Sequence, residues 1–123
     1  MTGYYDDPQA ALDRIDRDIA QARERAERAA EVKASIDQVR GRARSARGEV
    51  QAEVDATGRL RDLVLDQSAM ALRPTELAAL VLRTVVDAGR DAGRRAVAVA
   101  DDAFGEGSSI SAHLRAEVEQ RWA

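Results

Sequence analysis

The stretch "GEVQAEVDATGRLRDLVL", residues 48–65, interrupts a sequence that is otherwise typical of helices. Its apolar residues return at every second position, at Val50, Ala52 and Val54, with charged or amide side chains between them. This period of two is typical of a β-strand, and Gly58 lies where a hairpin loop needs a left-handed residue. The stretch therefore predicts a β-hairpin. Because an isolated two-stranded ribbon is at best marginally stable, something else must cover it.

The second half of the hairpin does not alternate simply. Leu63, Val64 and Leu65 are three apolar residues in a row. They predict a strand that is covered on both faces, or a bulge near Arg61–Asp62. Either the helices of the same chain or a second copy of the chain would cover the additional face.

The segment before the hairpin predicts a long helix over residues 8–40, with Asp6–Asp7 as the N-cap and Pro8 in the first turn. Apolar residues form a heptad stripe along it. The stripe consists of Leu12, Ile15, Ile19, Ala22, Ala26 and Ala29, and after a three-residue step it continues with Val32, Ile36 and Val39. Such a helix is roughly 45–50 Å long, too long for a small domain to bury. The stripe therefore predicts a partner helix.

The segment after the hairpin predicts a second long helix over residues 74–104, with Pro74 in its first turn and Glu76 near its positive end. Its expected buried stripe is Leu77, Leu80, Val81, Val85, Ala88, Ala92, Ala96 and Val99. Gly89 and Gly93 inside this helix indicate either the close approach of another backbone or neutral sequence drift without a structural role.

The sequence "GEGSS" at residues 105–109 ends the second helix, and Ser108 or Ser109 is expected to cap a short last one. The apolar side of that helix carries Ile110, Leu114, Val118 and Trp122. The predicted fold class is α+β: a long N-terminal helix, a short antiparallel hairpin at 48–66, a long second helix and a short C-terminal helix. The predicted division is a domain over residues 1–104 and a linker with an amphipathic helix over 105–123.

Composition excludes several classes of protein. The 123 residues contain no cysteine, so disulfides and thiolate metal sites are impossible. No run of apolar residues is long enough to span a membrane, and the start of the chain is acidic where a signal peptide would be basic. We therefore expect a cytoplasmic protein. The net charge of −3 argues mildly against binding to nucleic acid, because such domains are usually basic.

No arrangement of residues predicts catalysis. Phosphate-binding and dinucleotide-binding glycine motifs are absent, and the single histidine, His113, is expected on the surface of the last helix. Acidic residues that are conceivable as metal ligands are expected to be solvated instead. They are Asp13, Asp16, Asp101, Asp102 and Glu106. We expect no enzyme, no metal and no cofactor.

The segment that most clearly suggests a binding chemistry is "RGRARSARG", residues 40–48, which has four arginines and no acid. We expect a loop here, whose arginines either bind phosphates through paired hydrogen bonds or belong to a solvated connector. The four are Arg40, Arg42, Arg44 and Arg47. Secondary candidates on the second helix are Arg90, Arg94 and Arg95, although Asp87 and Asp91 can pair with them within the helix.

The order of these motifs resembles the YbaB/EbfC family of bacterial nucleoid-associated proteins, most closely its actinobacterial branch. The resemblance rests on the strand–turn–strand pattern at Gly48–Leu60, on the proline-started helix with "ELAALVL", and on "DAGRRA" at residues 91–96. It implies a tweezer-like homodimer that forms through the short sheet. A third strand could come from "QSAMAL", residues 67–72. The residues expected at the dimer interface are Val50, Val54, Leu60, Leu63, Val64 and Leu65.

The resemblance also implies binding to duplex DNA with little sequence preference, in the nucleoid. Two features depart from the family pattern: Arg73 replaces a serine-like helix cap, and residues 1–40, which include the first helix, carry nine acids against seven bases. We therefore expect weak binding that falls as salt rises. The alternative is a protein-interaction scaffold or adaptor, for example one associated with secretion, that uses its helical arm without DNA. A membrane-surface role for the last helix is less favoured, since Glu117 and Glu119 offset Arg115 and Arg121.

Overall fold

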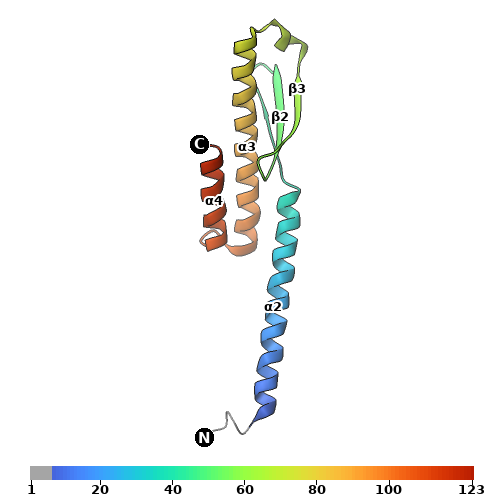
Figure 1. Ribbon diagram of the computed structural model, residues 1–123, viewed down its shortest axis with the longest axis vertical. Helices are drawn as coiled ribbons and strands as arrows, with labels where there is room; N and C mark the ends of the chain where they lie inside the picture. The colour runs from blue at the N-terminus through green and yellow to red at the C-terminus, as the bar shows by residue number, and fades with distance from the viewer. Residues whose placement is uncertain (1–6) are drawn as a thin grey trace. The chain divides into compact units, whose positions relative to one another are not determined.

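The computed structural model describes residues 7–123, so Asp6 of the predicted cap lies outside the described residues. Its elements follow the order helix, sheet, helix, helix (Figure 1). They are α2 (Pro8–Asp37), β1 (Arg40–Arg44), β2 (Val50–Asp55), β3 (Leu60–Leu65), the 3-10 helix η1 (Gln67–Ala71), α3 (Pro74–Phe104) and α4 (Ser109–Arg121). The predicted α+β class is confirmed. The chain divides into two compact units, one up to Lys33 and one over Ala34–Ala123.

Helix α2 begins at Pro8, and the Asp7 carboxylate accepts a hydrogen bond from the backbone N–H of Ala10 at 3.1 Å. This bond satisfies one of the free N–H groups of the first turn. The helix ends at Asp37, three residues before the predicted end. The Arg40 guanidinium donates to the carbonyl oxygens of Asp37 and Val39 at 3.1 and 2.8 Å, and so closes the C-terminus.

The loop predicted over residues 40–48 is wrong for its first half, because Arg40–Arg44 form the edge strand β1. β1 pairs antiparallel with β2, with Arg40 opposite Asp55 and Arg44 opposite Gln51. Sequence pattern missed this strand because its inward positions are Gly41 and Ala43 rather than large apolar residues. A Cβ on Gly41 would overlap the backbone of Ala88 and Ala92 in α3, so only glycine lets β1 lie against that helix.

The third strand predicted at "QSAMAL" is also wrong, because Gln67–Ala71 form the 3-10 helix η1. Asp66 caps it by accepting hydrogen bonds from the Ser68 N–H at 3.0 Å and the Ser68 hydroxyl at 2.6 Å. An aspartate and a serine at this spacing favour a turn over a strand. The third strand is therefore β1, which precedes the hairpin, and the sheet order is β1-β2-β3.

The predicted hairpin consists of β2 and β3, and Gly58 in its turn has φ +91°. The register shifts between Glu53 and Val54: Glu53 pairs with Asp62 and Val54 with Leu60, so Arg61 is an extra residue in β3. The bulge predicted near Arg61–Asp62 is confirmed.

Helix α3 covers β1 and β2 and packs on its other side against α4 (Figure 1). Val50, Ala52 and Val54 of β2 are buried on the α3 side of the sheet, where Ala88 completes the small core. The expected stripe of α3 is buried at Ala88, Ala92 and Ala96 and half-buried at its leucines and valines. The core is therefore thin and built mostly from small side chains, which suits close contact between backbones.

The two glycines inside α3 allow α4 to approach. A Cβ on Gly89 would overlap the Trp122 ring, and one on Gly93 would overlap Val118. The space at both glycines is filled by side chains of α4, not by the other backbone that the sequence pattern indicated as one explanation. Ser108 caps α4 by accepting from the Ser111 N–H at 3.1 Å, whereas Arg73 provides no side-chain cap for α3.

We predict that Gly41→Val lowers the free energy of unfolding by about 3 kcal/mol, because the side chain must push β1 away from α3. Urea unfolding followed by circular dichroism at one protein concentration measures this. Gly107→Val is the matched control, since nothing lies within 4 Å of a Cβ at Gly107. Equal effects of the two substitutions would contradict the close approach at Gly41.

Candidate nucleic-acid interface

Arg40, Arg42 and Arg44 occupy alternate positions of β1, so their side chains leave the sheet on the face opposite α3. We call these three residues the β1 row. Neighbours in the row are spaced by two residues of a strand, about 6.6–6.8 Å. The arginines predicted for a flexible loop therefore stand on a regular, ordered element.

Two members of the β1 row have partners within the chain. The Arg42 guanidinium lies 2.8 Å from the Glu53 carboxylate on the neighbouring strand, yet its side chain remains 71% exposed. The Arg40 guanidinium donates to the carbonyl oxygens of Asp37 and Val39 at the end of α2. An exposed ion pair such as Arg42–Glu53 stabilises a protein little, so a phosphate can compete with Glu53 for the guanidinium.

Arg44 and Arg47 lie at the β1–β2 turn and are exposed. Within residues 7–123, neither of them forms an ion pair. Two carboxylates nearby remain charged. The pKa of Glu49 is lowered by its own backbone N–H and by the Ser45 hydroxyl, and that of Asp66 by the Ser68 hydroxyl and N–H. The charges of Arg47 and Arg44 lower these two pKa values further.

Two of the three α3 candidates, Arg94 and Arg95, converge on Asp91. Arg95 Nε lies 3.0 Å and Arg94 Nη2 3.6 Å from this carboxylate, which also accepts the backbone N–H of Arg42 at 3.0 Å. Burial by itself raises the pKa of Asp91, but the bonds from Arg42 and Arg95 and the charges of Arg95 and Arg94 outweigh it and hold the pKa below its usual value. Asp91 therefore ties α3 to the free edge of β1 and neutralises part of the charge of its arginines.

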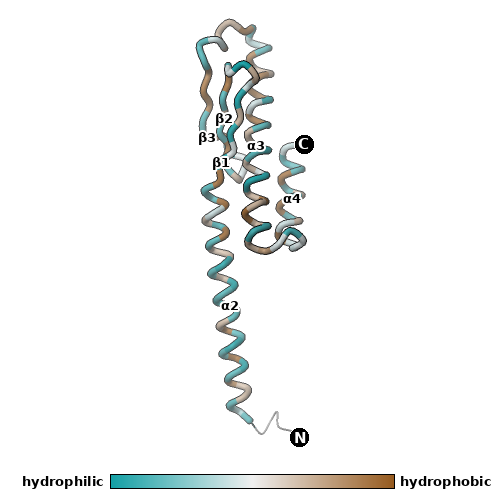
Figure 2. Tube along the Cα trace, turned by 180° about the vertical axis from the view of Figure 1, so that it is seen from behind, coloured by the Kyte–Doolittle hydropathy of each residue, from teal (hydrophilic) through white to brown (hydrophobic). Residues whose placement is uncertain are grey.

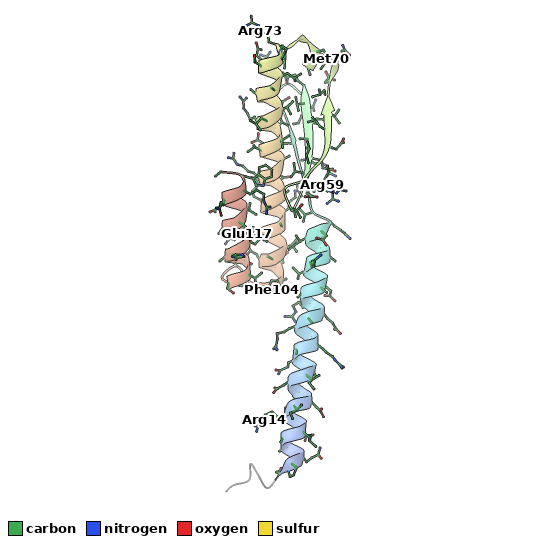
Figure 3. All side chains as sticks on the ribbon, viewed as in Figure 1. Arg14, Arg59, Met70, Arg73, Phe104 and Glu117 are labelled. Atoms are coloured by element: carbon green, nitrogen blue, oxygen red, sulfur yellow. The ribbon has the colours of Figure 1, made fainter. Side chains whose placement is uncertain are left out.

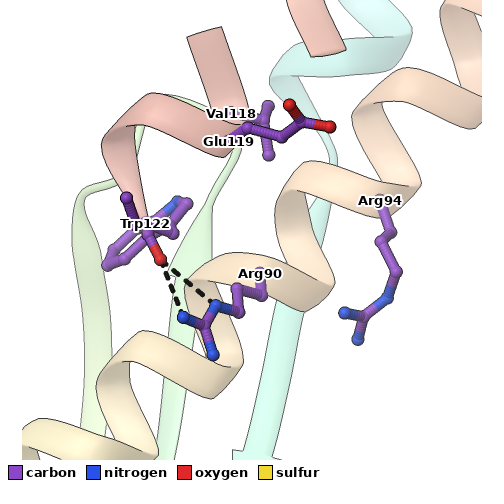
Figure 4. A pocket seen from close by; sticks show the side chains of 6 residues that line it. Arg90, Arg94, Val118, Glu119 and Trp122 are labelled. Carbon is purple, nitrogen blue, oxygen red and sulfur yellow. Dashed lines mark hydrogen bonds between the residues drawn. The ribbon is translucent and has the colours of Figure 1, made fainter. Parts of the chain in front are cut away.

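Arg90 holds the C-terminal helix. Its Nε and Nη2 both donate to the main-chain carbonyl oxygen of Trp122, at 3.2 and 2.9 Å (Figure 4). A hollow of about 320 Å³ next to this contact is lined by Arg90, Arg94, Val118, Glu119, Trp122 and Ala123. Arg90 is committed to a structural contact, which makes it the weakest of the seven arginine candidates.

The structure also gathers arginines that the sequence did not single out. Arg59 and Arg61 lie at the β2–β3 turn, where Figure 3 shows Arg59 at the opposite end of the sheet from Arg73. Arg121 of α4 donates to the Ala56 carbonyl oxygen at 3.0 Å, and Arg40 pairs in register with Asp55. We call Arg40, Arg59, Arg61 and Arg121 the turn cluster. The strand pairing of Arg40 and the docking of α4 create it, so no local sequence signal predicted it.

The carboxylate inside the turn cluster is Asp55, whose Oδ1 accepts three hydrogen bonds and whose Oδ2 faces Arg61. It accepts from the Thr57 N–H at 3.0 Å, the Thr57 hydroxyl at 2.6 Å and the Arg59 N–H at 3.0 Å, with Arg61 at 3.8 Å. Burial alone raises its pKa, but the Thr57 and Arg59 bonds and the Arg61 charge leave the pKa lowered. One carboxylate among four arginines leaves a local excess of positive charge.

The residues predicted for dimerisation fall into two groups. Val50 and Val54 are fully buried within the protomer, against α3. The other four are on β3, where every residue is exposed. They are Leu60, Leu63, Val64 and Leu65, with exposed fractions of 42, 39, 47 and 41%. β3 is an edge strand without cover, while the edge of β1 is occupied by Asp91.

Within the described residues, no group of acidic or histidine side chains could hold a metal ion, and no helix is long and apolar enough to cross a membrane. His113 is an exposed residue whose Nε2 lies 3.1 Å from Glu117 of the same helix.

A family model described as the YbaB/EbfC DNA-binding family matches residues 13–107, well over half of the chain. The chain belongs to this family. The family predicted from the hairpin and the proline-started helix is therefore confirmed, and membership of the YbaB/EbfC family supports a DNA-binding role in the nucleoid. The comparison with curated proteins gave no match. The match to the YbaB/EbfC model includes the β1 row and ends before α4, so Arg121 and Trp122 lie outside it.

We predict that Asp91→Asn lowers the free energy of unfolding by about 2 kcal/mol at neutral pH, because charged hydrogen bonds to β1 and α3 are lost. A carboxylate whose pKa is lowered in the folded state stabilises that state above the unfolded pKa, about 3.9, and loses this effect as pH falls through the folded pKa. The difference between wild type and variant should therefore narrow below about pH 4.

Urea unfolding at a series of pH values measures this difference. Asp102→Asn, which changes an exposed carboxylate on the same helix, is the control and should have little effect. A difference that stays constant down to low pH would show that the charge of Asp91 is not what stabilises the contact.

Proposed function

We propose that this protein binds duplex DNA without sequence specificity, as a nucleoid-associated homodimer whose contact residues are the β1 row and Arg47. The observation that carries the proposal is the set of arginines on β1 and its turn, of which Arg42, Arg44 and Arg47 are exposed, within a domain of a DNA-binding family. Guanidinium groups bind phosphates through paired hydrogen bonds, and phosphates carry no sequence information. The turn cluster adds Arg59, Arg61 and Arg121 as further candidates.

The charge of the chain determines how strong this binding is. The net charge is −3, and Glu53 and Asp91 compete with phosphates for Arg42, Arg94 and Arg95. A few phosphate contacts on an acidic protein give weak binding that decreases steeply with salt. We therefore expect the protein to bind DNA chiefly at low salt or at high local concentration.

The DNA proposal is tested by fluorescence anisotropy of labelled duplexes of two unrelated sequences at about 50, 100 and 200 mM salt. Arg44→Gln/Arg47→Gln should weaken binding equally for both sequences and reduce the slope of log K against log salt by about 0.9 for each lost contact. These two arginines are chosen because removing them breaks no ion pair within the described part of the chain.

Arg83→Gln is the control for charge, because Arg83 is an exposed arginine on α3 outside both groups. It should leave the salt slope unchanged. An unchanged slope for the Arg44/Arg47 variant would refute the assigned contact, and a strong preference for one duplex would refute the lack of specificity.

The homodimer is proposed to form through β3. Its apolar side chains are exposed in the protomer and its outer edge is unpaired, and both features are satisfied when a second β3 lies beside it. Val50 and Val54 support this interface from within, because they fix β2 on α3 and do not reach the surface.

We predict that Leu63→Asp/Leu65→Asp converts a dimer into a 13.4 kDa monomer in sedimentation equilibrium at micromolar concentration. Charged side chains on the edge should block pairing of two apolar strands. The measurement is made in an Ile15→Ser/Ile19→Ser background, which removes association through α2. Leu82→Asp is the control, because Leu82 is 66% exposed on α3. A dimer that survives the β3 changes would place the interface elsewhere.

A second candidate function is a scaffold or adaptor that binds another protein through α2. The observation that favours it is the exposure of Leu12, Ile15 and Ile19 at 55, 52 and 48%. Ile15→Ser/Ile19→Ser should then abolish the interaction and leave DNA binding intact, whereas the arginine changes should do the reverse.

A further inference from the structure

Helix α2 carries an apolar stripe along one face. None of its residues is buried, and the stripe residues from Leu12 to Ala29 are all exposed. Figure 2 shows the helix as mainly hydrophilic, with short hydrophobic stretches that recur along it. A stripe with this heptad spacing forms a seam for another helix.

The sizes of the stripe residues change along the helix. The N-terminal half supplies Leu12, Ile15 and Ile19, and the C-terminal half supplies Ala22, Ala26 and Ala29. Two parallel copies would place large residues against large ones at one end and alanine against alanine at the other. The two ends would then need different distances between the helix axes, so one half of the pair would pack poorly. Two antiparallel copies place one large residue and one alanine in every layer.

The antiparallel layers follow from this match. Leu12 lies opposite Ala29 of the other copy, Ile15 opposite Ala26, and Ile19 opposite Ala22, and symmetry repeats each layer. The matched segment, residues 12–29, is about 27 Å long at 1.5 Å per residue. It lies entirely inside the helix Pro8–Asp37.

The charges that flank the stripe favour the same orientation. With Leu12 at heptad position a, the e positions hold Asp16 and Arg23, and the g positions hold Asp18 and Arg25. In an antiparallel pair e faces e and g faces g. Asp16 then meets Arg23 and Asp18 meets Arg25, and symmetry gives four opposite-charge pairs.

A parallel pair uses these charges less well. There each g position faces the following e position of the other copy, so only Asp18 and Arg23 meet, and Asp16 and Arg25 face alanines. Within the described residues none of the four side chains is already in an ion pair. Both size and charge therefore select the antiparallel arrangement.

We propose that α2 is a self-association element that pairs antiparallel with α2 of a second copy of this chain, with Leu12 opposite Ala29. This contact is separate from the one proposed at β3 and uses no arginine of the candidate DNA interface. If the β3 dimer also forms, each dimer has two such arms. The arms then join neighbouring dimers, or strengthen one dimer by a second contact.

The test uses disulfide cross-linking of the full chain, which has no cysteine of its own. Ile15→Cys/Ala26→Cys should form covalent dimers under mild oxidation, because these positions face each other in the antiparallel pair. The two cysteines of one helix are about 16 Å apart, too far to form a disulfide within the chain. Ile15→Cys alone and Ala26→Cys alone should cross-link poorly.

Two controls fix the face and the orientation. Arg17→Cys/Glu24→Cys places cysteines at the same levels of the helix pair but on the side away from the seam, and it should not cross-link. Efficient cross-linking of Ile15→Cys alone would mean a parallel pair and would overturn the proposal.

The charge pattern is tested in the same cysteine background. Asp16→Arg/Asp18→Arg creates four like-charge pairs and should reduce the apparent association constant by roughly tenfold. Addition of Arg23→Asp/Arg25→Asp restores opposite charges and the original net charge, and should restore cross-linking.

Two further outcomes would overturn the proposal. One is no rescue by the added changes in the charge test, and the other is no cross-linking of Ile15→Cys/Ala26→Cys at any protein concentration. In the second case, the exposed stripe would be left for a helix of a different protein. DNA binding by Ile15→Cys/Ala26→Cys and by the charge-restored variant, which both keep the net charge of −3, should be unchanged when it is measured by anisotropy. Failure of the arm proposal is therefore distinct from failure of the DNA proposal.

Discussion

The close approach of β1 to α3 at Gly41 is the contact on which the rest of the domain depends. With no Cβ at Gly41, the strand backbone rests against Ala88 and Ala92, and the sheet has a third strand. β2 thereby becomes a central strand, and Val50 and Val54 are buried although the core contains few large side chains. The same contact turns the β1 arginines to the opposite face, since side chains alternate along a strand.

Asp91 makes the two edges of the sheet unequal. Its carboxylate accepts the outward N–H of Arg42, so the β1 edge is occupied, whereas β3 is exposed along its whole length. A strand edge with free backbone groups and apolar side chains favours pairing with another strand. Asp91, which forms ion pairs with Arg94 and Arg95, thus also occupies the β1 edge, and the uncovered edge of the sheet is β3.

The positive charge of this acidic protein is local. Arginines gather at the β1–β2 turn and at the β2–β3 turn, while acids such as Glu53 and Asp91 lie between them and form ion pairs. Helix α2 differs, because acids (Asp16 and Asp18) flank the N-terminal half of its apolar stripe and bases (Arg23 and Arg25) flank the C-terminal half, a pattern that suits an antiparallel helix pair. The proposed phosphate-binding surface therefore belongs to the sheet unit, and the proposed helix-pairing surface belongs to α2.

The sequence by itself determined the helices, the hairpin, its bulge and the family, because heptad spacing, strand alternation and a proline-started helix are local patterns. It also identified the arginines of residues 40–47. Only the tertiary structure decided that Arg40–Arg44 form a strand, since Gly41 and Ala43 have no large side chains to mark an inward face and need α3 to make one. Only the tertiary structure placed Arg121 near Arg59 and Arg61 and showed that Arg90 binds the end of α4. The contacts that do so join residues more than thirty positions apart. Local pattern specifies elements, but contacts between distant residues depend on how backbones pack.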